Sequence, residues 1–271
     1  MTVSSNNAEE IGVQLSVNCD IVKDWMLGNR LKVNAEKTHL LTVGTSTRLR
    51  CQYSQVKVKM DGVEIKESDS QAEILLGVTI QSNLKWHNHI NSLLNKLQVR
   101  FNALEKLRNI LPYSQRKTIV EGIFISVLSY CLPVFCGSDQ ADLDSLQVMQ
   151  NKAARIITNS GIRTNRNTIF NELGWMTVRQ LAWYHTALST YRIRKNREPE
   201  YLSHIMNYDN RRGKIIVPNS RLSLAKNSFC FRGADQWNKL PETIRQSQTI
   251  KKFKVLLKNW VLNNVPKFSN D

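Results

Sequence analysis

The hydrophobic period of this chain changes from two to 3.6 residues near residue 82, which limits the folds open to it. Before that point, Gln55–Met60 alternates apolar and polar residues, and Asp61-Gly62 separates this stretch from Val63–Ile65. This pattern predicts a β-hairpin. After residue 82, apolar residues recur at helical spacing. We therefore expect an α+β fold in which a small sheet precedes a mostly α-helical remainder.

The first part combines one predicted helix with short predicted strands. Residues 8–28 carry apolar side chains at helical spacing, with Trp25 on the apolar face. The apolar runs Leu40–Gly44 and Ile74–Ile80 predict strands, the second of them buried. A small sheet covered by one helix follows from these elements.

The remainder is predicted to be helical with one irregular interruption. Helices are expected over residues 90–112, 114–130, 142–157, 176–195 and 249–261. Ser114 is the predicted cap of the second of these helices. Residues 196–224, with Pro199 and Pro218, predict a loop or long linker.

Positive charge gathers toward the end of the chain. The net charge is +16 over 271 residues, and it divides into −1 for residues 1–80, +4 for 81–160 and +13 for 161–271. A basic region of this kind predicts a polyanionic partner, while a merely solvated surface stays open as the alternative. Hydrophobic residues make up 41% of the chain, which excludes wholesale disorder. No apolar run reaches the roughly 18 residues of a spanning helix, so no membrane partner is expected.

The metal-ligating residue types are scattered. Five cysteines without a signal peptide predict reduced thiols in an intracellular protein, nuclear or cytoplasmic. Cys131 and Cys136 have no second ligand pair nearby and are interpreted as buried helix residues. His87 and His89 lack further ligands at suitable spacing, so no metal site is expected.

The residues alone do not predict a catalyst. Phosphoryl transfer with two metal ions needs converging carboxylates, and no Asp-Asp pair occurs anywhere in the chain. No Asp-x-Asp falls on a predicted strand, since Asp142 and Asp144 lie in the first turn of a predicted helix. Neither a glycine-rich phosphate loop nor a nucleophile motif is present. We expect no catalytic residue, cofactor or small-molecule substrate for this chain.

One family has these features in the same order. Trp25–Thr38 resembles the fourth conserved palm motif of non-LTR (LINE-type, jockey-like) retrotransposon reverse transcriptases. Residues 75–90, with Leu-Gly-Val-Thr-Ile and Leu-Lys-Trp, resemble the fifth motif, the primer grip. Residues 130–135 and 146–157 are similar to thumb and post-thumb helices, and Trp237–Pro241 is similar to a shared C-terminal tail. The resemblance covers nearly the whole chain.

The resemblance implies a partial polymerase. Residues 1–81 would be the end of the palm, 82–160 the thumb, and 161–271 a basic helical C-terminal region. The parent activity is an RNA-directed DNA polymerase that uses Mg²⁺. Met1 stands about where the residue after the family's two catalytic aspartates should be, so we expect a truncated, inactive fragment that still binds RNA, DNA or their hybrid.

The candidate nucleic-acid-binding residues follow from the resemblance and the charge together. Lys37 matches a palm lysine near the leaving pyrophosphate, and Leu76-Gly77 matches the primer-grip turn. The basic candidates, on the thumb helix and in the C-terminal region, are Lys96, Arg100, Arg108, Arg192, Arg194, Lys195, Arg197, Arg211, Arg212 and Lys214. A co-opted, stand-alone RNA- or DNA-binding protein and an unrelated helical interaction protein remain the alternatives.

Overall fold

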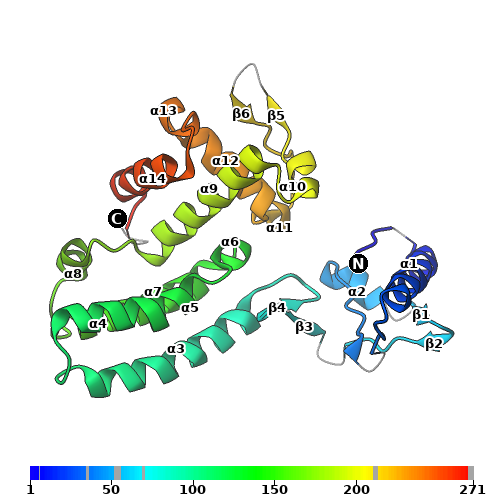
Figure 1. Ribbon diagram of the computed structural model, residues 1–271, viewed down its shortest axis with the longest axis horizontal. Coiled ribbons are helices and arrows are strands. Elements are labelled where there is room, and N and C mark those ends of the chain that lie inside the picture. Colours follow the sequence, from blue (N-terminus) through cyan, green and yellow to red (C-terminus); the bar gives the residue numbers. More distant parts are fainter. Residues whose placement is uncertain (6, 35–36, 52–55, 69–70, 210–212, 268–271) are drawn as a thin grey trace. The chain divides into compact units, whose positions relative to one another are not determined.

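The computed structural model describes the chain except for residues 6, 35–36, 52–55, 69–70, 210–212 and 268–271 (Figure 1). It divides into two compact units, which we call unit 1 (Met1–His89) and unit 2 (Ile90–Asp271). Helices predominate, and the strands pair into separate two-stranded sheets. The predicted α+β class with small sheets is confirmed.

Unit 1 is built around a helix that packs on a hairpin. Helix α1 (Ala8–Gly28) lies on strand β1 (Lys59–Met60), which pairs antiparallel with β2 (Val63–Glu64). Asp61 and Gly62 turn the chain with φ angles of +57° and +77°, the left-handed pair that a two-residue hairpin requires. The predicted hairpin is therefore confirmed. Its buried residues, with one from α1, are Cys19, Val56, Val58, Met60 and Ile65.

The predicted inward position of Trp25 is wrong. Its side chain is 66% exposed, although Ile11 and Leu15 of the same helix pack against the core. The reason is length, because the hairpin ends at Asp61. That residue already reaches Asp20 through its N–H and Lys23 through a 2.6 Å ion pair. The last turns of α1 extend past the sheet that would have covered them.

The prediction of a continuous buried strand over Ile74–Ile80 is also wrong. This segment is a hairpin of β3 (Ala72–Leu75) and β4 (Val78–Gln81), with Leu76-Gly77 at the turn. Both turn residues have positive φ, +48° and +81°, which glycine adopts without strain. The predicted strand Leu40–Gly44 contributes only a bridge from Leu40 to Glu67. A short helix, α2 (Ser46–Cys51), follows it.

The first half of unit 2 is a series of helices. These are α3 (His87–Leu107, in unit 2 from Ile90), α4 (Tyr113–Val120), α5 (Ser126–Ser129), α6 (Leu132–Phe135), α7 (Gln140–Thr158) and α8 (Arg166–Leu173). A π-helical turn, Glu121–Ile125, joins α4 to α5. Ser114 is not the cap of α4, because Pro112 occupies that position and makes no side-chain hydrogen bond there.

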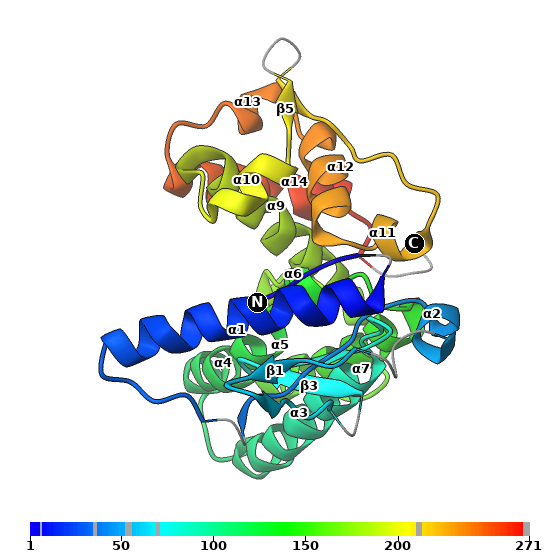
Figure 2. The same ribbon diagram turned by 90° about the vertical axis from the view of Figure 1, so that its right-hand side faces the viewer.

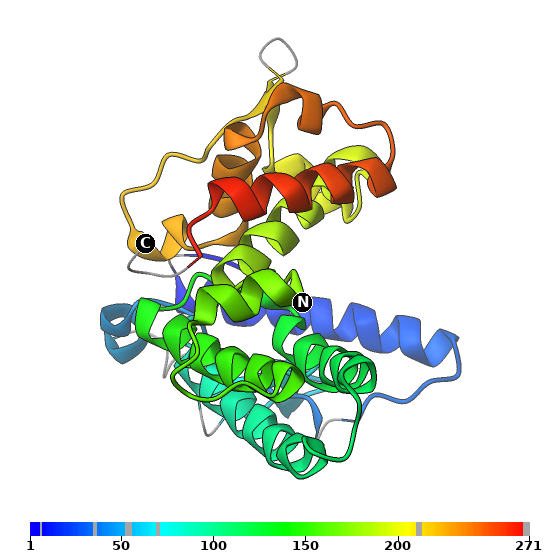
Figure 3. The same cartoon turned by 90° about the vertical axis from the view of Figure 1, so that its left-hand side faces the viewer.

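The second half of unit 2 surrounds one long helix, α9. Its elements are α9 (Val178–Asn196), α10 (Glu200–Ile205), β5 (Tyr208–Asp209), β6 (Lys214–Ile215), α11 (Ser223–Lys226), α12 (Phe229–Lys239), α13 (Glu242–Arg245) and α14 (Ile250–Asn264). Helices α6, α7, α10, α12 and α14 all contact α9 (Figures 1 and 3). The β5–β6 hairpin lies beside α12 (Figure 2). The prediction of an irregular linker over residues 196–224 is therefore wrong in part.

Stacked aromatic rings form the centre of this half. The Tyr191 and Phe253 rings stack with centroids 4.2 Å apart, and Trp237 continues the stack 6.2 Å from Phe253. Trp237 and Phe253 are fully buried, and Tyr191 is 4% exposed. Such pairs stabilise a fold by about 0.5–1.5 kcal/mol each beyond the area they bury. The stack joins α9, α12 and α14 into one core.

Cys131 and Cys136, predicted to be buried within a helix, instead flank the short helix α6. Cys131 precedes α6 with a left-handed φ of +52°, and Cys136 follows the same helix. Both are half-buried rather than buried. Among the residues whose side chains the structure describes, Cys19, Cys131, Cys136 and Cys230 are free thiols, as expected.

Helices α9 and α12 approach each other closely at Gly233. A Cβ atom added there would lie 2.7 Å from the Thr190 Oγ1 and 3.1 Å from the Met206 Cε. We expect Gly233→Ala to destabilise the protein by about 1–3 kcal/mol through overpacking, measured as a lower midpoint of urea unfolding. Gly122→Ala is the control, because a Cβ there meets no heavy atom within 4 Å. Equal midpoints for the two variants would contradict the prediction.

Candidate nucleic-acid interface

Arg108, predicted to contact phosphates, is held inside unit 2. Its guanidinium donates to the Asn159 Oδ1 at 2.8 Å and to the Ser160 carbonyl at 3.0 Å, both just after α7. A third bond, at 3.1 Å, reaches the Glu105 carboxylate. These bonds fix the end of α3 to the end of α7, so Arg108 is committed to the fold.

Two further arginines, Arg116 and Arg155, also hold parts of unit 2 together through hydrogen bonds to backbone carbonyls. Arg116 donates to the carbonyls of Ile157, Arg108 and Leu111 at 2.8–3.1 Å. Arg155 donates to those of Gly161, Ile162 and Thr164 at 3.1–3.3 Å. The last carbonyls of a helix have no partner within it and carry the negative end of its dipole. Ile157 lies in the last turn of α7, whereas the other acceptor carbonyls lie in the segments that follow α3 and α7. Each guanidinium thus satisfies several carbonyls at or just beyond a helix end. We call Arg108, Arg116 and Arg155 the arginine clamps.

Lys96 and Arg100 remain on the surface of α3. They stand four residues apart and therefore share one face. Lys96 is exposed, and Arg100 donates to the Lys96 carbonyl at 3.2 Å. Of the three candidates predicted for this helix, the structure places Lys96 and Arg100 on one face of α3 and Arg108 just after its end.

The palm candidates lie in unit 1. Lys37 is exposed, and its backbone N–H donates to Asn34. Leu76 is 83% exposed at the tip of the β3–β4 hairpin, beside Gly77. The turn that the resemblance implies at this place is present, whereas contact with a primer strand stays a prediction.

The remaining basic candidates lie at the end of α9 and on β6. Arg192, Lys195, Arg197 and Lys214 are exposed. Arg194 is also exposed, but its guanidinium carbon lies 3.9 Å from the centre of the Tyr208 ring and 5.2 Å from that of Trp237. Arg211 and Arg212 lie outside the described residues. We call Arg192, Lys195, Arg197 and Lys214 the basic cluster.

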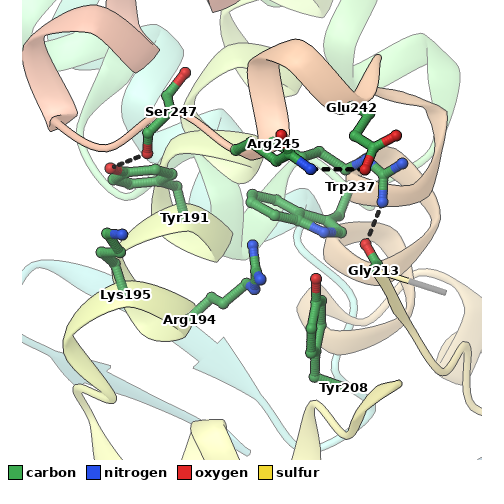
Figure 4. Close-up of a pocket in the computed structure, with 10 residues that line it drawn as sticks. Tyr191, Arg194, Lys195, Tyr208, Gly213, Trp237, Glu242, Arg245 and Ser247 are labelled. Carbon is green, nitrogen blue, oxygen red and sulfur yellow. Dashed lines mark hydrogen bonds between the residues drawn. The ribbon is translucent and has the colours of Figure 1, made fainter. Parts of the chain in front are cut away.

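A pocket of about 440 Å³ opens beside Lys195, one member of the basic cluster (Figure 4). It is lined by Tyr191, Arg194, Lys195, Tyr208, Gly213, Trp237, Glu242, Arg245, Gln246 and Ser247. Arg245 donates to the carbonyls of Leu240 and Gly213, which fixes the start of β6 beside α13. Sequence reasoning noticed Trp237 only as part of a tail motif, and it missed Tyr208 and Arg245. No local pattern connects these residues, because they come from three elements.

Two titratable groups of α9 report a positive environment. Burial raises the pKa of Tyr184, and the charge of Arg192 opposes that change. Burial lowers the pKa of His185, and the charges of Arg192 and Lys254 lower it further. Positive potential on α9 therefore comes from α14 as well as from the basic cluster.

The described part of the chain has neither a cluster of metal-ligating side chains nor a helix that could span a membrane. No group of three or more His, Cys, Asp or Glu side chains there could hold a metal ion. None of the described helices is both long enough and apolar enough to cross a bilayer. His89 has a structural contact, since its Nδ1 accepts the backbone N–H of Thr79 at 3.2 Å.

Comparison with known proteins supports a reverse-transcriptase-related origin. The chain is 23% identical over 198 residues to the probable RNA-directed DNA polymerase from transposon BS of Drosophila melanogaster. The match covers 71% of this chain and 21% of that protein, so the chain spans about a fifth of its relative's length. No family model and no solved structure matches the chain.

Arg108, which follows α3, and Lys96, which lies on it, should differ in their effect on stability. We expect Arg108→Ala to lower the free energy of unfolding by about 1–3 kcal/mol, because it leaves the Ser160 carbonyl and the Asn159 amide without their donor. Lys96→Ala should stay within about 0.5 kcal/mol, as an exposed substitution does. Urea unfolding of both variants measures the difference, and similar losses would contradict the assignment of Arg108 as a clamp.

Proposed function

We propose that this chain binds nucleic acid as the non-catalytic part of a reverse-transcriptase-related protein. Residues 1–81 correspond to the end of the palm, 82–160 to the thumb and 161–271 to a basic C-terminal region. The observation that carries the proposal is the exposed basic cluster, in contrast to Arg108, Arg116 and Arg155, whose guanidinium groups are committed to the fold. The distant match to a transposon RNA-directed DNA polymerase supports it.

The basic cluster contacts phosphates rather than bases in this proposal. Exposed lysines and arginines neutralise backbone charge and carry no sequence information. Lys96 and Arg100 provide a second, smaller contact on α3, while Lys37 and the Leu76-Gly77 turn belong to the palm-like part. The partner is an RNA, a DNA or a hybrid of the two.

The salt dependence of binding tests the proposal. Each neutralised phosphate adds roughly −0.7 to −0.9 to the slope of log affinity against log salt concentration. We expect the combined substitution Arg192→Gln, Lys195→Gln and Arg197→Gln to make the slope less steep by about two units, measured by fluorescence anisotropy with a single-stranded oligonucleotide.

A matched control removes the same charge elsewhere. Arg30→Gln, Lys32→Gln and Lys66→Gln change three exposed residues of unit 1, where the net charge of residues 1–80 is −1. These changes should leave the slope close to that of the unchanged protein. An affinity that does not respond to salt, or an equal change from both triple variants, would overturn the proposal.

Polymerase activity is expected to be absent from these 271 residues. Two-metal catalysis requires paired carboxylates, and the only Asp-x-Asp of the chain, Asp142 and Asp144, lies on α7 rather than on a strand. We expect no nucleotide incorporation on a primed template with Mg²⁺ or Mn²⁺, with a complete reverse transcriptase as positive control. A template-dependent product would show that this chain holds metal ions in another way.

A further inference from the structure

The pocket beside the basic cluster has features that the basic cluster lacks. It is recessed, it lies between α9, α12, α13 and the β5–β6 hairpin, and aromatic rings form part of its lining (Figure 4). Its volume of about 440 Å³ is within the range that small ligands occupy. A group that enters it would leave water and meet fixed partners.

Trp237 offers this pocket a hydrogen-bond donor without an acceptor. The residue is fully buried, and its Nε1 has no hydrogen-bond partner among the described residues. The indole nitrogen points toward the side of the pocket where Tyr208 and Gly213 lie (Figure 4). Buried tryptophan N–H groups usually have a partner, and an unsatisfied one is unfavourable. An acceptor atom of a ligand would satisfy this N–H after a small shift of the lining side chains, because the nitrogen is covered in the structure.

The charges around the pocket select an anion. Arg194, Lys195 and Arg245 bring three positive charges, against the one carboxylate of Glu242. That carboxylate already accepts a 2.6 Å hydrogen bond from the Gln246 side chain. Arginine and lysine are donors only, so the lining favours a negatively charged group that carries several acceptors. Phosphate has these properties.

The Tyr208 ring holds the Arg194 guanidinium in one orientation before a phosphate binds. Its guanidinium lies over the Tyr208 ring at 3.9 Å, a stacked position that limits its rotation. A guanidinium held in one place loses less entropy when it binds a phosphate. Lys195 is exposed beside it and stands at the border between the pocket and the basic cluster.

We propose that this pocket holds a phosphate group at the end of a nucleic-acid strand. A terminal phosphomonoester has one sugar attached and can enter a recess, whereas an internal phosphodiester continues on both sides. It also carries more negative charge at neutral pH. The strand as the source of the phosphate rests on the proposed function, while the phosphate site itself does not.

Indole resonances of the intact protein test the site directly. The chain has six tryptophans, and selective ¹⁵N labelling makes each Nε1–H visible. We expect inorganic phosphate to shift the Trp237 resonance, assigned through Trp237→Phe, and to leave the Trp183 resonance unchanged. Chloride at equal ionic strength should shift neither. No movement of the Trp237 resonance at any phosphate concentration would overturn the phosphate site.

Two controls keep the test valid if Trp237→Phe destabilises the protein. Trp237→Phe removes a fully buried side chain, so its thermal unfolding is compared with that of Trp183→Phe, which changes one ring of the Trp183–Trp260 pair. Lys195→Gln leaves the core intact and should weaken phosphate binding about tenfold, as the loss of one charged hydrogen bond does. An unchanged affinity of Lys195→Gln for phosphate would contradict the assigned lining.

Oligonucleotides of one sequence then identify the source of the phosphate. Strands with a 5′-phosphate, a 3′-phosphate or two hydroxyl ends are compared by anisotropy, and one phosphorylated end should bind about tenfold more tightly. Equal affinities, together with an indole shift from inorganic phosphate, would overturn the strand end and leave a site for free phosphate or nucleotides. Failure of all three strands to bind would overturn the proposed function and the strand end, and the indole shift would still decide the pocket.

Discussion

The first turn of α9 begins inside the protein, where its backbone N–H groups cannot reach water. Thr177 and Gln180, both fully buried, exchange hydrogen bonds between side chain and backbone and form a capping box. The N–H of Val178 donates to the Gln147 side chain on α7, and the Gln180 side chain donates to the Val265 carbonyl after α14. One buried set of polar groups thus joins α7, α9 and the end of α14, and the core of unit 2 forms around it.

Apolar periodicity predicted the long helices because each of them buries a continuous stripe. Local chemistry also predicted the Asp61-Gly62 turn. Elements held by distant contacts were missed, since nothing near them in sequence indicates the partner. Strand β6 is an example, because the Asn238 side chain of α12 pairs with both the N–H and the carbonyl of Ile215, at 2.9 and 2.8 Å. A two-residue strand of this kind depends on a side chain 23 positions away.

The candidate site was predictable in its location but not in its members. The charge gradient directs attention to the end of α9, yet composition cannot distinguish a cation that faces solvent from one that bonds helix carbonyls. Arg108 was predicted to contact a phosphate from the resemblance and its charge, and the structure places its guanidinium on Asn159 and Ser160. Pocket residues such as Tyr208 and Trp237 meet only after the chain folds. A guanidinium that is bonded to a carbonyl keeps its positive charge. Every cation of the chain therefore contributes to the long-range attraction of a negatively charged partner.

The arginine clamps also determine which exchanges between arginine and lysine the chain can accept. A guanidinium holds several carbonyls at once through a planar set of donors, while an ammonium group is a compact charge on a flexible stem. Lysine at Arg116 or Arg155 would keep the charge and lose the simultaneous contacts. Under the proposed function, lysine at Arg192 or Arg197 would meet a phosphate nearly as well. Homologous chains should therefore keep arginine where it bonds several carbonyls at once, and exchange the two residues where only charge is needed.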